Sequence, residues 1–296
     1  MPYKYLDQWH VKMRDLQRRL IQKHASDSTI KSYNAALTKC WNLLGKPKSP
    51  LDVSLEEYQA LEQRMIEDGL AENSIVLYTT KLKIFLRFVK YPNVNEIYVE
   101  SKLHAKEDRV FLEPDQQSRA RELAHNFGLK YELAFSLAVD NSLRRGDLAN
   151  ITLEEAVQMA QTGQGYITQK GNRRRPIVLH KNTMEPLTKY LDERDQAVTK
   201  LSSTGISPEP YLFINFRTGK HISPGTVHTW MMKISNASGF YFRAHDLRAT
   251  CVRRHARAGT PPEIVMMITG HKNFGTTFTH YYGKDTYSMR NAQDRI

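Results

Sequence analysis

The sequence predicts a mainly helical protein with a small β component, an α+β fold in two domains. Apolar residues recur at helical spacing through the first hundred residues, and a polar, charged stretch follows at 96–110. Beyond that stretch, helical segments alternate with short β-like runs. The length of 296 residues, at ~150 residues per domain, also suggests two domains. We therefore expect a helical bundle at 1–95, a linker at 96–110 and a mixed domain at 111–296.

Four apolar stripes define the expected helices of the first domain. They run from Trp9 to Leu20, from Ile30 to Leu44, from Leu55 to Met65 and from Ile75 to Val89. Residues 26–28 offer a cap before the second stripe, and Gly45 ends it. Asn73 can cap the fourth helix. The pattern predicts a compact bundle of about four helices.

The second domain shows a mixed pattern. Helices are expected at 115–126, at 131–139, near 182–201, and from Ser223, His245 and Pro261 onward. Residues 166–168 and 177–179 flank the turn dipeptide Gly171-Asn172, which predicts a β-hairpin. A short buried run is expected at 211–214.

The charge of the chain points to an anionic partner. Lys and Arg total 43 against 31 Asp and Glu, which gives a net charge of +12, and 40% hydrophobic residues are typical of a globular protein. A basic globular protein most often binds nucleic acid. Two cysteines are too few for a disulfide framework or a Cys-rich zinc site. This low cysteine content fits a reducing setting, so we expect a cytoplasmic, nucleoid-associated protein. No stretch reaches the ~20 apolar residues that a membrane-spanning helix needs.

The first cluster with chemical potential follows an expected helix. Arg144 stands at the end of this apolar helix, and Asp147 comes three residues later. Because three residues make about one helical turn, the acid can orient a side chain on the same face. Taken alone, such a pair is more often a surface ion pair.

The second cluster is the tip of the expected hairpin. Lys170 precedes the Gly171-Asn172 turn and can reach from there into a groove, and three arginines follow at 173–175. Arginines in such a position can neutralise phosphates. Taken alone, the cluster is more typical of a nonspecific phosphate-binding tip than of a catalytic element.

Two further clusters lie near the end of the chain. His245 and Arg248 are three residues apart on one expected helix, so both can address the same anion. Gly270-His271 comes next, and the phenols of Tyr281 and Tyr282 follow within a dozen residues.

These residues, taken in order, resemble the tyrosine recombinase (phage integrase) family. The set consists of Arg144, Lys170, His245, Arg248, His271 and a tyrosine shortly after. The type IB topoisomerases share much of the constellation. The resemblance covers essentially the whole chain. It implies a helical core-binding domain that binds DNA, followed by a mixed catalytic domain of the tyrosine recombinase type.

The resemblance also implies a reaction and a role for each residue. A site-specific recombinase cleaves and rejoins DNA through a 3′-phosphotyrosyl intermediate, with no metal, cofactor or ATP. Arg144 and Arg248 would bind the non-bridging phosphate oxygens, a task that suits a planar guanidinium. Lys170 would protonate the leaving 5′-oxygen. His245 would accept or relay the tyrosine proton, and His271 would hydrogen-bond the phosphate.

The nucleophile has two candidates. The spacing usual in the family would place the tyrosine at His280, so this chain carries one extra residue. Tyr281 lies four residues after Thr277 and stays on the expected helical face, whereas Tyr282 is rotated by about 100°. We expect Tyr281 to be the nucleophile, with Tyr282 as the open alternative.

Other positions depart from the family pattern or extend it. Asn141-Ser142 stands in place of Thr-Gly before the first arginine, and Thr269 replaces a common Leu, which changes packing rather than charge. Asp147 matches the acidic position of the family and is expected to hold an arginine or a hairpin group in place. The expected DNA-binding residues are Arg173, Arg174, Arg175 and Arg243.

The implied partners are double-stranded DNA and three further copies of the chain, as a homotetramer on two DNA sites. Accessory DNA-bending proteins are further candidates, and no membrane partner is expected. Two other functions stay open. A catalytically silent DNA-binding or architectural protein with this fold would explain the offset tyrosine, and an RNA-binding protein would explain the basic loop.

Overall fold

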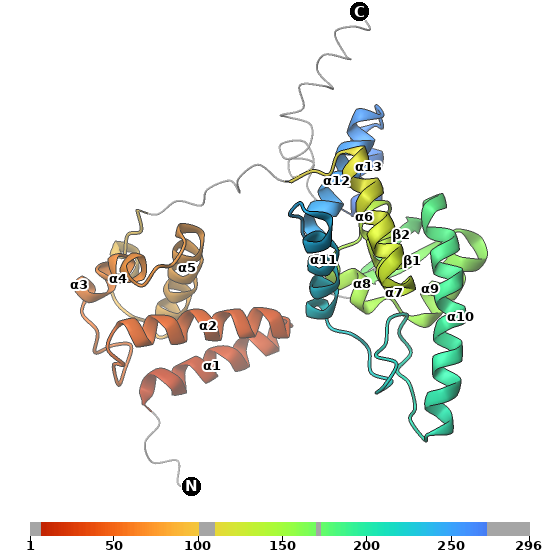
Figure 1. The fold of residues 1–296 in the computed structure, drawn as a ribbon. Coiled ribbons are helices and arrows are strands. Elements are labelled where there is room, and N and C mark those ends of the chain that lie inside the picture. Colours follow the sequence, from red (N-terminus) through yellow and green to blue (C-terminus); the bar gives the residue numbers. More distant parts are fainter. Residues whose placement is uncertain (1–6, 101–109, 170–172, 271–296) are drawn as a thin grey trace, which may run out of the picture. The chain divides into compact units, whose positions relative to one another are not determined.

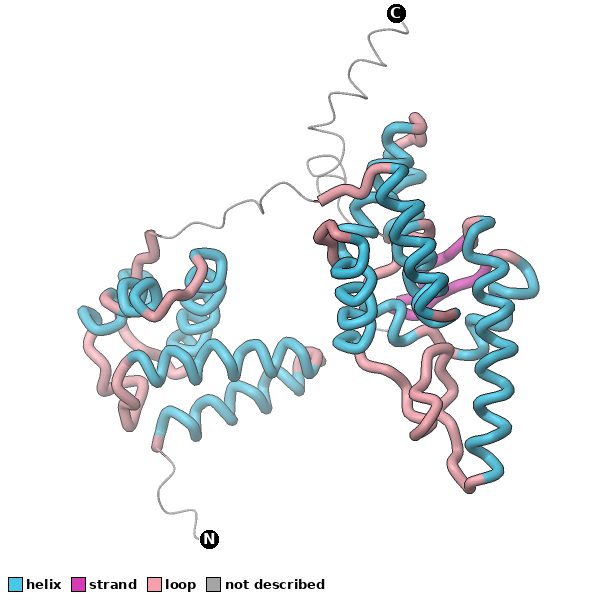
Figure 2. The backbone as a smooth tube through the Cα atoms, in the orientation of Figure 1, coloured by secondary structure: helices cyan, strands magenta, loops and turns pink. Residues whose placement is uncertain are grey.

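The structure is a computed structural model that describes residues 7–100, 110–169 and 173–270. The chain divides into two compact units, Met1–Glu107 and Asp108–Ile296 (Figure 1). Each unit has a hydrophobic core of its own. Figure 2 shows that helices dominate both units and that the second unit also holds a two-stranded sheet. The predicted mainly helical α+β fold is therefore confirmed.

Five α-helices and a short 3₁₀ helix make up the described part of the first unit. They are α1 (Gln8–Gln22), α2 (Asp27–Leu43), α3 (Leu55–Gln59), α4 (Leu61–Glu67), α5 (Glu72–Phe88) and η1 (Val94–Glu96). The pattern predicts about four helices, and the difference arises because the third stripe divides at Ala60 into two short helices. The prediction of Asn73 as a cap is wrong. Ala71, whose backbone is extended, is the N-cap residue of α5.

Local side-chain chemistry explains where several of these helices start. The Ser26 hydroxyl accepts a hydrogen bond from the backbone N–H of Thr29, as the cap predicted at 26–28 requires. Ser54 and Glu57 form a reciprocal capping box at the start of α3. The core lies between the helices, where the rings of Trp9 and Phe85 stand 5.3 Å apart.

Eight helices and a hairpin form the described part of the second unit. They are α6 (Pro114–Phe127), α7 (Leu129–Val139), α8 (Arg145–Asn150), α9 (Leu153–Thr162), β1 (Gln164–Gln169), β2 (Arg173–Val178), α10 (Lys181–Ser203), α11 (Pro224–Ser238), α12 (Ala244–Arg257) and α13 (Pro262–Thr269). The predicted helices match six of these, whereas α8 and α9 are not among the predictions. The strands pair antiparallel, with Gln164 opposite Val178, as the hairpin prediction requires. The predicted turn at 171–172 lies outside the described residues.

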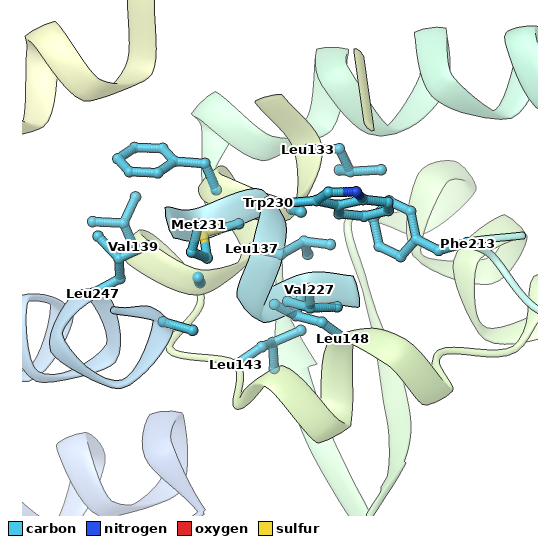
Figure 3. Packing of buried hydrophobic residues seen from close by; sticks show 14 of the residues in the cluster. Leu133, Leu137, Val139, Leu143, Leu148, Phe213, Val227, Trp230, Met231 and Leu247 are labelled. Atoms are coloured by element: carbon cyan, nitrogen blue, oxygen red, sulfur yellow. The ribbon is translucent and has the colours of Figure 1, made fainter. Parts of the chain in front are cut away.

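The central element of the second unit is α7. Its side chains are buried from Leu133 through Val139, because α6, α10, α11 and α12 all pack around it. Figure 3 shows Leu137 among the apolar side chains of α8 and α11, with the indole of Trp230 near the ring of Phe213 at a centroid distance of 5.6 Å. Each large apolar side chain buried in this way contributes ~1.5–3 kcal/mol. This core holds the loop that leaves α7, and that loop carries Arg144.

In the part of the chain that the structure describes, no helix combines the length and the apolar character that crossing a membrane requires.

Candidate active site for a phosphodiester

The loop at 140–144, between α7 and α8, is anchored at its first residue. The Asp140 carboxylate is completely buried and receives Arg121 of α6 at 2.6 Å and Arg254 of α12 at 2.8 Å. A buried carboxylate is stable only when it is paired and hydrogen-bonded, and here each oxygen has its own arginine. Asp140 therefore ties the start of the loop to α6, the helix before α7, and to α12, whose Arg254 is 114 residues away.

The next residue ties the loop to the hairpin and to α10. The Asn141 amide nitrogen donates to the carbonyl of Val178 at 2.9 Å, and its amide oxygen accepts from the Thr183 hydroxyl at 2.8 Å. Both contacts are possible only because the hairpin and α10 lie against the loop. Asn141, a departure from the usual Thr, thus has a structural role.

Ser142 adopts an unusual backbone conformation. Its φ is +57°, in the left-handed region that favours glycine, the residue usual in the family at this position. The turn aims the Ser142 carbonyl at Arg248, which donates to it through Nη1. The Ser142 side chain is fully buried, and its hydroxyl has no hydrogen-bond partner among the described residues.

Arg144 is the exposed arginine of this loop. It is the N-cap residue of α8, and 43% of its side chain is exposed. Its backbone N–H donates to the Asp147 carboxylate at 3.2 Å, and its Nη1 lies 3.8 Å from the same oxygen. That oxygen also accepts from the Gln169 amide of β1 at 3.0 Å. Asp147 therefore contacts both an arginine and the hairpin, whereas the resemblance implies one or the other.

Arg248 lies beneath the surface, one helical turn after the exposed His245. Only 1% of Arg248 is exposed, and its Nη2 donates to the carbonyl of Thr269 at 2.6 Å while Nη1 donates to Ser142. The guanidinium of α12 thus joins the Arg144 loop to the last residue of α13. Gly270 follows in the left-handed conformation, φ +63°, and ends that helix.

Arg175, which the sequence predicts to bind DNA from the hairpin, faces inward in the structure. Side chains alternate across a strand, so Arg173 faces as Arg175 does while Arg174 faces the other way. Arg175 is 4% exposed and donates to the carbonyl of Asn141 at 3.1 Å, whereas Arg173 and Arg174 are exposed. Burial lowers the pKa of Arg175 to about 10, although Asp147 opposes the shift.

The other predicted residues divide into exposed and undescribed ones. Arg243, the N-cap residue of α12, has a half-exposed side chain whose Nε donates to the buried Asp246 carboxylate at 3.1 Å. This contact raises the pKa of Arg243. Predicted residues outside the described part of the chain are Lys170, His271, Tyr281 and Tyr282.

The structure therefore brings Arg144 and Arg248 to one loop. Strand β1, which precedes Lys170, contacts this site through Gln169, and α13, which precedes His271, contacts it through Thr269. Sequence reasoning does not identify Asp140 or the inward role of Arg175. Strand alternation could have indicated the latter, because Arg175 pairs with the inward-facing Ile167. Nothing local signals Asp140, whose partners are far away in the sequence. Among the described residues, no group of three or more His, Cys, Asp and Glu is arranged to hold a metal.

Comparison with known proteins gives a consistent picture. The model of the phage integrase family matches residues 110–287. Tyrosine recombinase XerC of Shewanella sp. (strain ANA-3) is 23% identical over 281 residues, which cover 92% of this chain and 88% of the relative. Tyrosine recombinase XerD of Rickettsia bellii (strain RML369-C) is 21% identical over 283 residues, which cover 90% of this chain and 92% of the relative.

Solved structures with the same fold include integrases crystallised on DNA. A lambda integrase fragment bound to DNA superimposes with a TM-score of 0.70 at 19% identity, over 94% of this chain and 97% of that one. The Tn1549 transposon integrase with circular intermediate DNA gives 0.70 at 15% identity, over 98% and 99%. A lambda integrase tetramer on a Holliday junction gives 0.68 at 20% identity, over 95% and 76%.

Proposed function

The chain belongs to the phage integrase family, the tyrosine recombinases, and on that premise we propose that it breaks and rejoins DNA through a 3′-phosphotyrosyl intermediate without metal or ATP. One observation carries the proposal. Arg144 and Arg248, which lie 104 positions apart, meet at the loop that contains Ser142. Two guanidiniums beside one loop can bind the two non-bridging oxygens of a phosphodiester.

The two arginines are held differently. Arg144 is exposed and can contact a phosphate directly, while Asp147 limits its rotation from the buried side. Arg248 donates to two carbonyls through Nη1 and Nη2. Because only 1% of Arg248 is exposed, its guanidinium would bind a phosphate oxygen only after the segments that cover it open. Fixed donors of this kind stabilise the charge that develops on a pentacoordinate phosphate without reorganising during the reaction.

The remaining steps are assigned through the family. The Tyr281 oxygen would attack the phosphorus, forming a P–O bond to tyrosine while the bond to the 5′-oxygen breaks. His245 would take or relay the tyrosine proton, Lys170 would give a proton to the leaving oxygen, and His271 would hydrogen-bond the phosphate. The new 5′-hydroxyl, or that of another strand, reverses these steps. Phosphodiester energy is conserved, so no nucleotide triphosphate is needed.

DNA would be bound by both units. Residues 1–95 are proposed as the core-binding domain and residues 111–296 as the catalytic domain, joined by 96–110. Arg173, Arg174 and Arg243 are exposed cations that can contact phosphates. We propose a homotetramer on two double-stranded DNA sites, in line with the tetrameric lambda integrase named above, acting in the cytoplasm at the nucleoid with accessory DNA-bending proteins.

A covalent-trapping experiment tests the reaction. The full chain is incubated with a pool of nicked duplexes whose sequences around the nick are randomised, and protein–DNA adducts are recovered after denaturation. The wild type and Tyr282→Phe should give the adduct, and Tyr281→Phe should give none. If both single variants trap DNA as well as the wild type does, the proposed nucleophile is wrong.

The same experiment separates the second candidate. A catalytically silent protein of this fold would bind duplex DNA, with an affinity that falls steeply with salt, and the unmodified chain would form no adduct. The buried state of Arg248 is the observation that favours this candidate. An adduct from the wild type that disappears in Arg248→Met, while duplex binding persists, excludes it.

A further inference from the structure

We infer that Arg175 is a positioning residue that holds together the three segments carrying the proposed catalytic groups: the hairpin, the loop of Arg144 and the end of α13. This inference rests on the proposed function, since it concerns the same site. Arg175 does not touch DNA in this assignment. It acts through the backbone that it holds.

The contacts of Arg175 reach all three segments. From its place in β2, the guanidinium donates to the carbonyl of Asn141 at 3.1 Å and to that of Ser142 at 3.5 Å. It also donates to the carbonyl of Ile268 near the end of α13. Its Nη1 lies 3.9 Å from the Asp147 carboxylate. Arg175 and Ile268 are 93 residues apart, so one buried side chain links β2 to a helix that is distant in the sequence.

Arg175 and Arg248 form a pair of parallel connections. Both donate to the carbonyl of Ser142, and they donate to the consecutive carbonyls of Ile268 and Thr269. Helix ends leave such carbonyls without partners inside the helix, and here two guanidiniums supply them. The backbone that leads to Gly270 is therefore held on the Arg144 loop twice. Arg175 belongs to β2 and Arg248 to α12. Loss of the Arg175 side chain should therefore loosen the site while the contacts of Arg248 remain.

The chemistry of the contacts requires arginine. A guanidinium offers five donors in a rigid plane, so it can bind three carbonyls at once, whereas an ammonium on a flexible stem is a point charge. Even with its lowered value of about 10, the pKa of Arg175 keeps the group charged near neutral pH. The buried positive charge then faces the buried Asp147. Lysine could keep that attraction but not the full set of carbonyl bonds.

Gly270 completes the fit. A Cβ at this position would lie 2.9 Å from Cδ of Arg175, closer than real side-chain contacts allow. The stem of Arg175 therefore packs directly on the backbone that ends α13. Two features therefore favour glycine at position 270: the close contact with Arg175 and the left-handed φ of +63°.

The test compares Arg175→Met and Arg175→Lys with a matched control. The control is Arg194→Met: Arg194 is also buried and donates to the carbonyls of Tyr211 and Glu209, at 2.9 and 3.1 Å, but none of these residues belongs to the proposed site. Three quantities are measured for each full-length variant. They are the thermal midpoint, the affinity for a nicked duplex recovered from the trapping pool, and the rate of adduct formation at saturating protein.

Arg175→Met should slow adduct formation at saturation by about 100-fold, because small misplacements of reacting groups cost about that much. Its DNA affinity should stay within about threefold of wild type, since Arg175 makes no DNA contact. Arg175→Lys should recover part of the rate. Arg194→Met should lower the thermal midpoint and leave the saturated rate unchanged below that midpoint. A normal rate in a folded Arg175→Met, or equal rate losses in it and the control, overturns the inference.

Hydrogen exchange supplies a measurement that does not depend on activity. Amides at 141–144 and 266–270 should exchange at least about tenfold faster in Arg175→Lys than in the wild type, with α9 as an unchanged internal reference. Unchanged exchange in both segments overturns the inference even if no adduct forms from any protein. Absence of a wild-type adduct with the exchange difference present instead counts against the proposed function alone. Should Arg175→Met not fold, Arg175→Lys decides by the same criteria.

Discussion

Replacing Ser142 by glycine should stabilise the second unit. Ser142 holds φ at +57°, which costs a residue with a Cβ about 1 kcal/mol. Its buried hydroxyl, which lacks a partner among the described residues, costs about 1–3 kcal/mol more. Glycine removes both terms but loses about 0.5–1 kcal/mol through the greater freedom of the unfolded chain. The net expectation is a gain of about 2 kcal/mol in the free energy of unfolding.

A gain of this size should be measurable by calorimetry. In a unit of this size, about 2 kcal/mol corresponds to a rise of roughly 4–8 °C in the thermal midpoint. Leu37→Ala, which removes a buried side chain of the first unit, identifies the transition that belongs to that unit by lowering it. The transition unaffected by this variant is then followed in Ser142→Gly.

Ser142→Ala separates the two causes. Alanine removes the hydroxyl and keeps the Cβ, so it should recover only the polar part of the gain and leave the backbone strain in place. A lower midpoint for Ser142→Gly would refute the reasoning as a whole. A glycine variant that is less stable than the alanine variant by about 0.5–1 kcal/mol, the entropic loss of glycine alone, would show that the left-handed conformation stores no free energy at this position.

Three further predictions concern buried and titrating groups. Asp140→Asn should lower the free energy of unfolding by about 3 kcal/mol, because two arginines lose their carboxylate, and urea unfolding measures this. Burial raises the pKa of Cys40 to about 12 and that of Cys251 to about 11, so neither thiol should react with a disulfide reagent at pH 8 until the protein is denatured, when both should react. Burial, followed by the charge of a neighbouring arginine, lowers the pKa of His255. On acidification, His255 takes up its proton at a higher pH in the unfolded chain than in the folded chain. The free energy of unfolding should therefore fall as pH decreases through about 6.5, less steeply in His255→Gln. An unchanged pH slope in that variant would contradict this assignment.

Local patterns were sufficient for much of the fold. Helical spacing of apolar residues predicts six helices of the second unit, and the spacing around Gly171-Asn172 predicts the pairing of β1 with β2. These features depend on residues a few positions apart, so the sequence displays them directly. The helices α8 and α9 were not predicted; α8 has only six residues, whereas α9 begins with a Thr152 and Glu155 capping box that the sequence does display.

The site shows the same division. The contact between Arg144 and Asp147 follows from a separation of three residues, and the sequence determines it. The sequence also determines the order of residues that resembles a tyrosine recombinase. Only the tertiary structure decides that Arg175 is buried rather than free to grip DNA, and that Asp140 and Ser142 receive the arginines of distant helices. These contacts join residues about twenty to more than a hundred positions apart, and burial makes each depend on how all the surrounding helices pack.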